Sequence, residues 1–178
     1  MSESPDSGHG TIWLNGNFTP LAEARISPLD RGFLYGDGFF ETIRAENGRA
    51  LYLKLHLERL HESLCAFSLP LVSQPDWERI ISELLVRNKL AGHIAAVKII
   101  VTRGTASPPG LPLPEKPTVC ATAQRYDPPS SELYDKGWNL LIFKEGYAPP
   151  LAPFKSLNYL YHLSARQAAL NNLCHEAI

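Results

Sequence analysis

Near the beginning of the chain, short apolar segments twice flank an Asn-Gly pair. Asn-Gly is typical of a tight hairpin turn, because both central residues of such a turn take a positive φ. Two β-branched runs farther along are long enough for central strands. The sequence therefore predicts an antiparallel sheet. The segments that would form it are Thr11–Leu14 with Asn17–Thr19, Phe39–Arg44 with Arg49–Leu53, and Ile94–Thr102 with Thr118–Tyr126.

Large apolar residues at steps of three and four predict three amphipathic helices. The first would run from Lys54 to Leu69 and end before Pro70. The second would begin after a capping pattern formed by Ser73 and Asp76 and continue to Leu90. The third would cover residues 156–171. Together with the sheet, these helices predict a mixed α+β or α/β fold.

Proline-rich stretches divide the chain into segments. We expect residues 1–10 to form a flexible tail, 11–126 an N-terminal α+β domain and 127–136 a linker. Residues 137–178 would then begin a second domain, with a strand at Trp138–Lys144. The apolar run that starts near Cys174 resembles the lead-in to a buried strand, so we expect the remainder of that domain to be absent from these 178 residues.

Composition excludes several classes of protein. Seventeen Lys and Arg against eighteen Asp and Glu give a formal net charge of −1, whereas nucleic-acid and anionic-membrane binders carry a basic excess. No apolar run approaches the roughly 18 residues of a membrane helix, and the N-terminus lacks the features of a signal peptide. The three cysteines are widely spaced, and the six histidines form no metal-ligand pattern. We therefore expect a cytoplasmic protein with no metal site.

Two basic residues are candidates for chemistry. Lys155 follows an apolar, proline-rich stretch and precedes the predicted helix at 156–171. The positive end of a helix dipole and burial would both lower the pKa of its amine, and a neutral amine is what Schiff-base formation requires. Arg59 lies among leucines of the first predicted helix, where its guanidinium could bind a phosphate. The alternatives are a surface lysine and an arginine paired with Glu58 or Glu62.

Four spaced motifs, in this order, resemble those of the class IV pyridoxal-phosphate enzymes. This family includes branched-chain aminotransferases, D-amino-acid aminotransferases and aminodeoxychorismate lyases. The resemblance extends over nearly all of residues 12–178. The motifs are Asp30–Arg44, His56–Leu60 with Ser63, Val101–Gly104 and Lys155–Leu160.

The resemblance implies a fold-type IV enzyme that uses pyridoxal 5′-phosphate (PLP). Lys155 would form the Schiff base with the cofactor and move the substrate proton. Arg59 would bind the cofactor's phosphate, and Tyr159 would lie near its phenolic oxygen. Tyr35 and Phe40 would line the substrate pocket at the interface of a homodimer.

Arg44 and Arg103 are weaker substrate-binding candidates of the same resemblance. The loop after Gly104 lacks the arginine and histidine with which typical D-amino-acid aminotransferases hold the substrate carboxylate. It also lacks the second Arg-Gly pair common in aminodeoxychorismate lyases. The identity of the substrate therefore stays open at this point.

The function implied first is an aminotransferase that moves an amino group between a small amino acid and a 2-oxo acid. One alternative is an aminodeoxychorismate lyase that yields 4-aminobenzoate and pyruvate. Another is a truncated, non-catalytic relative that only dimerises.

Overall fold

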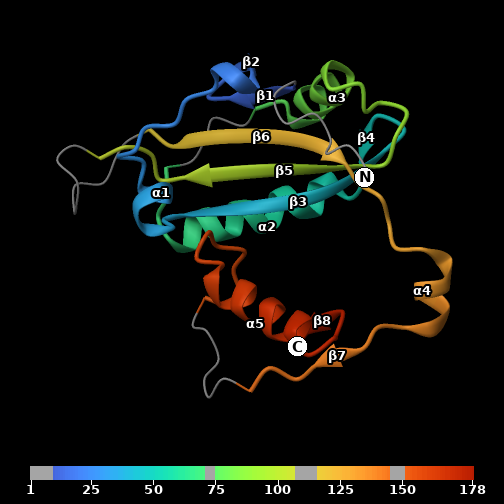
Figure 1. Cartoon of the computed structure of the whole chain (residues 1–178). Helices are drawn as coiled ribbons and strands as arrows, with labels where there is room; N and C mark the ends of the chain where they lie inside the picture. Colours follow the sequence, from blue (N-terminus) through green and yellow to red (C-terminus); the bar gives the residue numbers. More distant parts are fainter. Residues whose placement is uncertain (1–9, 71–74, 107–115, 145–150) are drawn as a thin grey trace.

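The computed structural model of the chain describes residues 10–70, 75–106, 116–144 and 151–178. Within these residues, an antiparallel sheet has the strand order β2-β1-β6-β5-β3-β4 (Figure 1). The antiparallel sheet expected from the sequence is confirmed. Its strands are β1 (Thr11–Leu14), β2 (Asn17–Pro20), β3 (Gly38–Glu46), β4 (Arg49–Ala50), β5 (Ala95–Thr102) and β6 (Thr118–Arg125).

Both predicted Asn-Gly turns form, with positive φ at each central residue. The φ angles are 47° and 98° at Asn15 and Gly16, and 49° and 75° at Asn47 and Gly48. The second hairpin is shorter than expected, because β4 ends at Ala50. A positive φ of 53° at Tyr52 then leads the chain directly into the first long helix.

Two helices cover one face of the sheet. They are α2 (Leu53–Ala66) and α3 (Trp77–Arg87), and the side chain of Asp76 caps α3 by accepting a hydrogen bond from the amide of Arg79. Ser73, the other half of the predicted capping pattern, lies outside the described residues. Alternate residues of β3, β5 and β6 face these helices and form the core. Its most deeply buried members include Ile43, Leu84, Leu85, Val97, Ile99 and Ala121.

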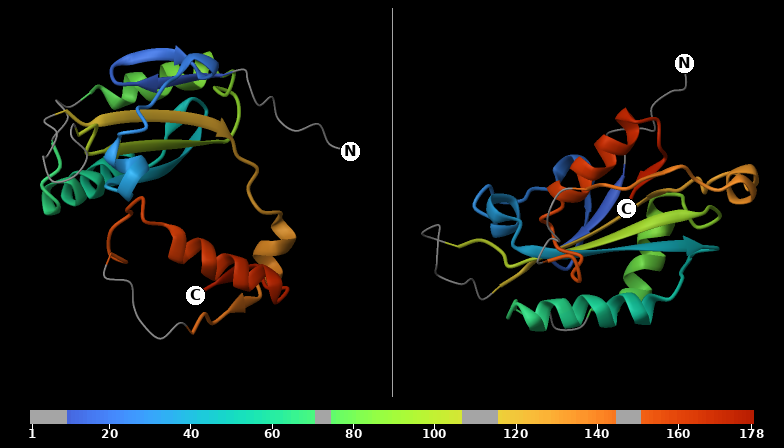
Figure 2. Two further views of the ribbon diagram at one scale, coloured as in Figure 1. Left: turned by 60° about the vertical axis from the view of Figure 1, so that its left-hand side comes forward. Right: turned by 90° about the horizontal axis from the view of Figure 1, so that it is seen from below.

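The remaining segments lie on other sides of this core. Helix α5 (Leu160–Asn171) is on the side of β3 opposite α2, as the right-hand view of Figure 2 shows. Strands β7 (Leu140–Leu141) and β8 (Glu176–Ala177) pair in parallel beside α5. Near the N-terminus are a 3-10 helix, η1 (Leu21–Glu23), and the short helix α1 (Arg31–Tyr35).

Two further sequence-based boundaries are wrong. The helix expected from Ser156 begins at Leu160, because the backbone at 155–157 bonds to the edge of β3. The strand expected at Trp138–Lys144 is limited to the two residues of β7. Part of the expected linker, Ser131–Lys136, forms helix α4.

None of the described helices is both long enough and apolar enough to cross a bilayer. In the same part of the chain, no group of three or more His, Cys, Asp or Glu side chains is arranged to hold a metal ion.

Candidate active site

The turn that leads into β3 is held by Asp30, which is 1% exposed. Its Oδ1 accepts a hydrogen bond from the amide of Gly32 at 2.8 Å. Its Oδ2 accepts from the hydroxyls of Thr102 and Thr118 at 2.9 and 2.6 Å. The motif that begins at Asp30 is therefore fastened to the ends of β5 and β6.

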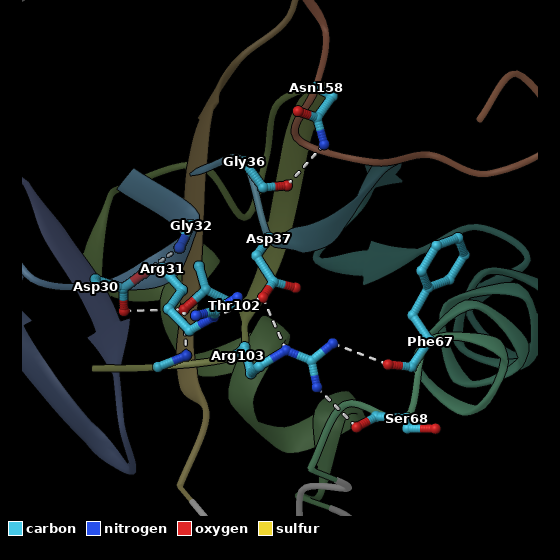
Figure 3. A network of polar contacts seen from close by, with 11 residues as sticks. Asp30, Arg31, Gly32, Gly36, Asp37, Phe67, Ser68, Thr102, Arg103 and Asn158 are labelled. Atoms are coloured by element: carbon cyan, nitrogen blue, oxygen red, sulfur yellow. Dashed lines mark hydrogen bonds and ion pairs between the residues drawn. The ribbon is translucent and has the colours of Figure 1, made fainter. Parts of the chain in front are cut away.

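A second carboxylate, Asp37, lies in the same turn and binds two arginines (Figure 3). One of its oxygens accepts from Nε of Arg31 and from Nε of Arg103, each at 2.8 Å. Burial raises the pKa of Asp37, but the two guanidinium groups outweigh that effect and hold the pKa below its ordinary value. The Nη atoms of Arg103 donate to the carbonyl oxygens of Ser68 and Phe67, each at 2.8 Å. Arg103, a substrate-binding candidate in the sequence, is 7% exposed and braces the turn from within.

The backbone around Lys155 is fastened to the outer edge of β3. The amide of Phe40 donates to the carbonyl oxygen of Lys155 at 2.9 Å. Two residues farther along, the amide of Leu157 donates to the carbonyl oxygen of Gly38 at 3.0 Å. The candidate lysine is thus placed by hydrogen bonds to a central element of the fold, although it lies 115 positions away from Phe40 in the sequence.

Close approach of the two segments requires glycine at position 38. A Cβ there would lie 2.6 Å from the carbonyl oxygen of Val101 and 2.9 Å from Cδ1 of Leu157. The side-chain amide of Asn158 adds a further attachment by donating to the carbonyl oxygen of Gly36 at 3.0 Å (Figure 3). The segment that carries Lys155 therefore contacts both β3 and the turn before it.

The amine of Lys155 lies against two aromatic rings. Its Nζ is 4.8 Å from the ring centroid of Phe40 and 5.8 Å from that of Tyr159. The two rings meet edge to face, with centroids 5.3 Å apart. Three residues predicted for the site are thereby brought together. The helix-dipole argument for Lys155 does not apply, because α5 begins five residues later, at Leu160.

Sequence reasoning missed Lys98, whose Nζ lies 4.5 Å from the ring centroid of Phe40. Lys98 is on β5 opposite Thr42, so it is a diagonal neighbour of Phe40 across the sheet. The only signal for this neighbour is the register of β3 on β5, which hydrophobic patterning alone does not supply.

Arg59 lies on α2 and is held by Glu41 of β3. Nε of Arg59 donates to Oε1 of Glu41 at 2.7 Å, and Nη2 donates to Oε2 at 2.6 Å. Nδ1 of His56 lies 2.8 Å from the same Oε2. Neither acidic neighbour considered in the sequence, Glu58 nor Glu62, is the partner of Arg59 in these contacts.

The charges in this cluster stabilise one another. Burial raises the pKa of Glu41, but hydrogen bonds from Arg59 and His56 outweigh it and bring the pKa below its ordinary value. The hydrogen bond to Glu41 in turn raises the pKa of Arg59. The side chain of Glu41 is 1% exposed, whereas that of Arg59 is 51% exposed. A buried carboxylate thus holds a guanidinium that still faces outward.

Tyr35 and Arg44, two other candidates from the sequence, are not linked to the group formed by Lys155, Phe40 and Tyr159. The exposed Tyr35 ends α1, and its ring centroid lies 5.1 Å from Cζ of Arg31. Arg44 forms an ion pair with Glu46 at 2.6 Å. Within the described residues, no hydrogen bond, ion pair or ring contact links either side chain to Lys155.

A cavity of about 680 Å³ lies elsewhere, between α2 and α3. Its walls include Leu57, Leu60 and Trp77, and none of the predicted site residues lines it. This cavity is therefore separate from the candidate active site.

Comparisons with known sequences relate the chain to aminotransferases. The family described as "Amino-transferase class IV" matches residues 38–178. A D-alanine aminotransferase of Staphylococcus haemolyticus is 33% identical over 170 residues, which are 94% of this chain and 59% of that protein. A putative branched-chain-amino-acid aminotransferase of Methanocaldococcus jannaschii is 40% identical over 96 residues, covering 52% of this chain and 32% of that protein. The chain thus spans about three fifths of the length of the D-alanine aminotransferase.

Solved structures share the fold. A branched-chain amino acid aminotransferase of Escherichia coli has a TM-score of 0.78 at 23% identity, over 96% of this chain and 59% of that one. A hypothetical aminotransferase of Mycobacterium tuberculosis, in a PLP-bound form, has a TM-score of 0.74 at 20% identity, over 95% and 61%. These likenesses confirm the fold-type IV architecture expected from the sequence motifs. Since the sequence match extends from Gly38 through the whole Lys155 segment, the chain belongs to the class IV aminotransferase family.

Proposed function

We propose that this chain carries the lysine of a PLP-dependent aminotransferase that moves an amino group between an amino acid and a 2-oxo acid. Membership of the class IV family supports this proposal. The observation that carries it is the placement of Lys155, whose backbone is bonded to β3 and whose amine lies against Phe40 and Tyr159. A lysine with a fixed backbone and an amine beside aromatic rings suits a residue that must meet a carbonyl group in one orientation.

The donor set in the structure fits PLP. Lys155 offers an amine for the cofactor's aldehyde, Tyr159 offers a phenol beside that amine, and Arg59 offers a half-exposed guanidinium for the phosphate. When bound, PLP supplies an aldehyde that condenses with amines and a ring that accepts the electrons released at the substrate Cα.

The part of this chain in the reaction is to hold and move a proton. Nζ of Lys155 would take the proton from Cα of the amino acid and return it when the reaction runs in the other direction. The rings of Phe40 and Tyr159 would exclude water from one side of Nζ. The hydrogen bond from the Phe40 amide to the Lys155 carbonyl would keep the start of that side chain in place while its end moves.

The relatives suggest the substrate class. One is described as a D-alanine aminotransferase and the other as a putative branched-chain-amino-acid aminotransferase, and these amino acids have small or aliphatic side chains. We therefore propose a small or aliphatic amino acid as the donor and a 2-oxo acid as the acceptor.

We also propose that the protein acts as a homodimer. Phe33 and Tyr35 of α1 are 75% and 50% exposed, and such large apolar side chains offer a surface to a second copy. Light scattering on the full-length protein would test this, and a monomer at micromolar concentration would contradict it.

The reaction is tested with the full-length protein. After addition of PLP, we expect a visible absorbance band, permanent attachment of the cofactor to Lys155 after reduction with borohydride, and loss of the band when an amino-acid substrate is added. The released 2-oxo acid is measured in the absence of an acceptor, which isolates the first half of the reaction. A protein that forms no band, or a label located by peptide mapping at another residue, would overturn the proposal.

A further inference from the structure

Glu41 is a buried acidic residue in the middle of a strand, and the proposed reaction gives it no direct role. We propose that Glu41 is a positioning residue that holds the Arg59 guanidinium in the orientation needed to bind the phosphate of PLP. This inference rests on the proposed function and adds to it a residue that the family resemblance did not assign.

The contact geometry favours orientation of Arg59 over simple charge pairing. Two atoms of the guanidinium, Nε and Nη2, bond to the two oxygens of Glu41, so the plane of the group is fixed side-on. The side chain of Arg59 is half exposed, and among the described residues no hydrogen bond engages its Nη1. The two N–H groups of Nη1 therefore remain available to an incoming anion.

The carboxylate of Glu41 is itself held from a second direction. Nδ1 of His56 contacts Oε2, and His56 and Arg59 are three residues apart on the same face of α2. With these contacts, Glu41 cannot turn away from α2 without losing three hydrogen bonds. The anchor for Arg59 is thus rigid.

The position of Glu41 in the sheet argues against a purely stabilising role. Its neighbours on the same face of β3 are Phe39 and Ile43, which belong to the apolar core. A buried ion pair is often no more stabilising than well-packed apolar residues of similar size. An acidic residue among these core positions is better explained by what it does to Arg59.

Consecutive residues of β3 would then serve the two ends of the cofactor. Phe40 fixes the backbone and contacts the amine of Lys155, while Glu41, on the other face of the strand, fixes Arg59. The aldehyde-binding and phosphate-binding residues would keep their spacing because one stretch of backbone positions both.

If Glu41 acts only through its charge, its replacement by glutamine should change PLP binding in one direction. If it positions Arg59, the change should be in the opposite direction. Removing a negative charge near a phosphate site should strengthen phosphate binding if only the electric field matters. If Glu41 positions Arg59, the same change frees the guanidinium and should weaken PLP binding by about tenfold or more, as loss of supporting contacts typically does.

The test compares the affinity of the full-length protein for PLP and for pyridoxal, which lacks the phosphate. Both affinities are measured by fluorescence titration for the wild type, Glu41→Gln, Arg59→Ala and the double variant. We expect Glu41→Gln to weaken binding of PLP and to leave binding of pyridoxal unchanged. In the double variant, we expect no further loss beyond that of Arg59→Ala, because both changes remove the same interaction.

Glu58→Gln is the matched control. Glu58 precedes Arg59 on α2, is half exposed and pairs with Lys54 at 3.8 Å, so its replacement removes the same charge without touching the Arg59 contacts. We expect its affinity for PLP to equal or slightly exceed that of the wild type. Thermal unfolding without ligand reports separately on the stability of each variant. Should Glu41→Gln fail to fold, Glu41→Asp, which keeps the charge but shortens the reach, should show the same selective weakening of PLP binding.

The outcomes separate this inference from the proposed function. Equal affinity of the wild type for PLP and pyridoxal, or no loss in Arg59→Ala, would overturn the assignment of Arg59 and the inference with it. If Arg59→Ala selectively loses affinity for PLP but Glu41→Gln keeps or gains affinity for PLP, only the positioning role is overturned. An equal loss of affinity for PLP and pyridoxal in Glu41→Gln would also overturn it, since that is the result of a general structural defect.

Discussion

Phe40 contacts Lys155 through both its backbone and its side chain. Its amide donates to the Lys155 carbonyl oxygen at 2.9 Å, and its ring centroid lies 4.8 Å from the Lys155 Nζ. A single residue of β3 therefore both bonds to the lysine backbone and contacts its amine. This relationship makes several properties of the protein testable.

Replacement of Lys155 by alanine should abolish the visible absorbance band that forms with PLP. The reason is that the amine proposed to condense with the aldehyde is gone. Lys98→Ala is a matched control, because Lys98 also lies against Phe40, at 4.5 Å from the ring centroid. We expect the Lys98→Ala protein to keep the band and the borohydride label on Lys155. A label found on Lys98 instead of Lys155 in the wild type would contradict the assignment of Lys155 as the reactive lysine.

Replacement of Gly38 by alanine should loosen the attachment of the Lys155 segment. The added Cβ would lie 2.6 Å from the Val101 carbonyl oxygen and 2.9 Å from Leu157, so β3 and the attached segment must separate. We expect a loss of about 1–3 kcal/mol in the free energy of unfolding, typical of overpacking. Hydrogen exchange should also become faster at the amides of Phe40 and Leu157.

Gly92→Ala serves as the control for that change, because a Cβ at Gly92 would meet no atom within 4 Å. Its free energy of unfolding should stay within about 1 kcal/mol of the wild type. Unchanged exchange at Phe40 in Gly38→Ala would show that the close approach at β3 is not needed to hold the lysine segment.

Replacement of Asp37 by asparagine should destabilise the fold. It removes the ion pairs with Arg31 and Arg103 and leaves the guanidinium of Arg103 buried without its carboxylate. We expect a loss of about 1–3 kcal/mol in the free energy of unfolding, measured by denaturant titration. The exposed Asp127, which pairs with Arg125, is the comparison. Asp127→Asn should change the free energy of unfolding by no more than about 0.5 kcal/mol. Equal losses in the two variants would show that the ion pairs of Asp37 with Arg31 and Arg103 do not stabilise the fold.

The stability of the protein should fall in acid. The pKa values of Asp37 and Glu41 in the folded state lie below their ordinary values of 3.8 and 4.5. Each carboxylate therefore contributes stability that is fully present above its ordinary pKa and is lost as the pH falls through the lower, folded-state pKa. The free energy of unfolding, measured from pH 6 to pH 3, should decline below about pH 4.5.

The Asp37→Asn variant isolates one of these two contributions. Its deficit relative to the wild type should be largest near pH 6 and should shrink as the pH falls below 3.8. A deficit that stays constant over this range would show that the charge of Asp37 is not the source of its effect.

The features that the sequence predicted correctly depend on neighbouring residues. Each Asn-Gly turn is specified by two adjacent residues that accept positive φ, and the helix around Leu60 and Leu64 by a repeat of three and four residues. Family motifs then supplied Lys155, Phe40 and Tyr159, which the structure brings together.

The features that the sequence missed depend on contacts between distant residues. Helix α5 does not begin at Ser156, because Ser156 forms a bridge with Phe39 far back in the chain. Arg59 does not pair with an acid on its own helix but with one 18 residues away on β3. Local periodicity carries no information on either partner. Neither contact can be predicted without knowing which distant residues lie next to β3.

The alternation of side chains along β3 has a consequence for how the site could be lost. A slip of β3 by one residue against β5 would turn Phe40 toward α2 and Glu41 toward Lys155. Such a slip would remove the aromatic surface under the lysine and the anchor of the arginine in one event. Correct formation of both therefore depends on one strand register, the alignment of Gly38–Ala45 with Ala95–Thr102.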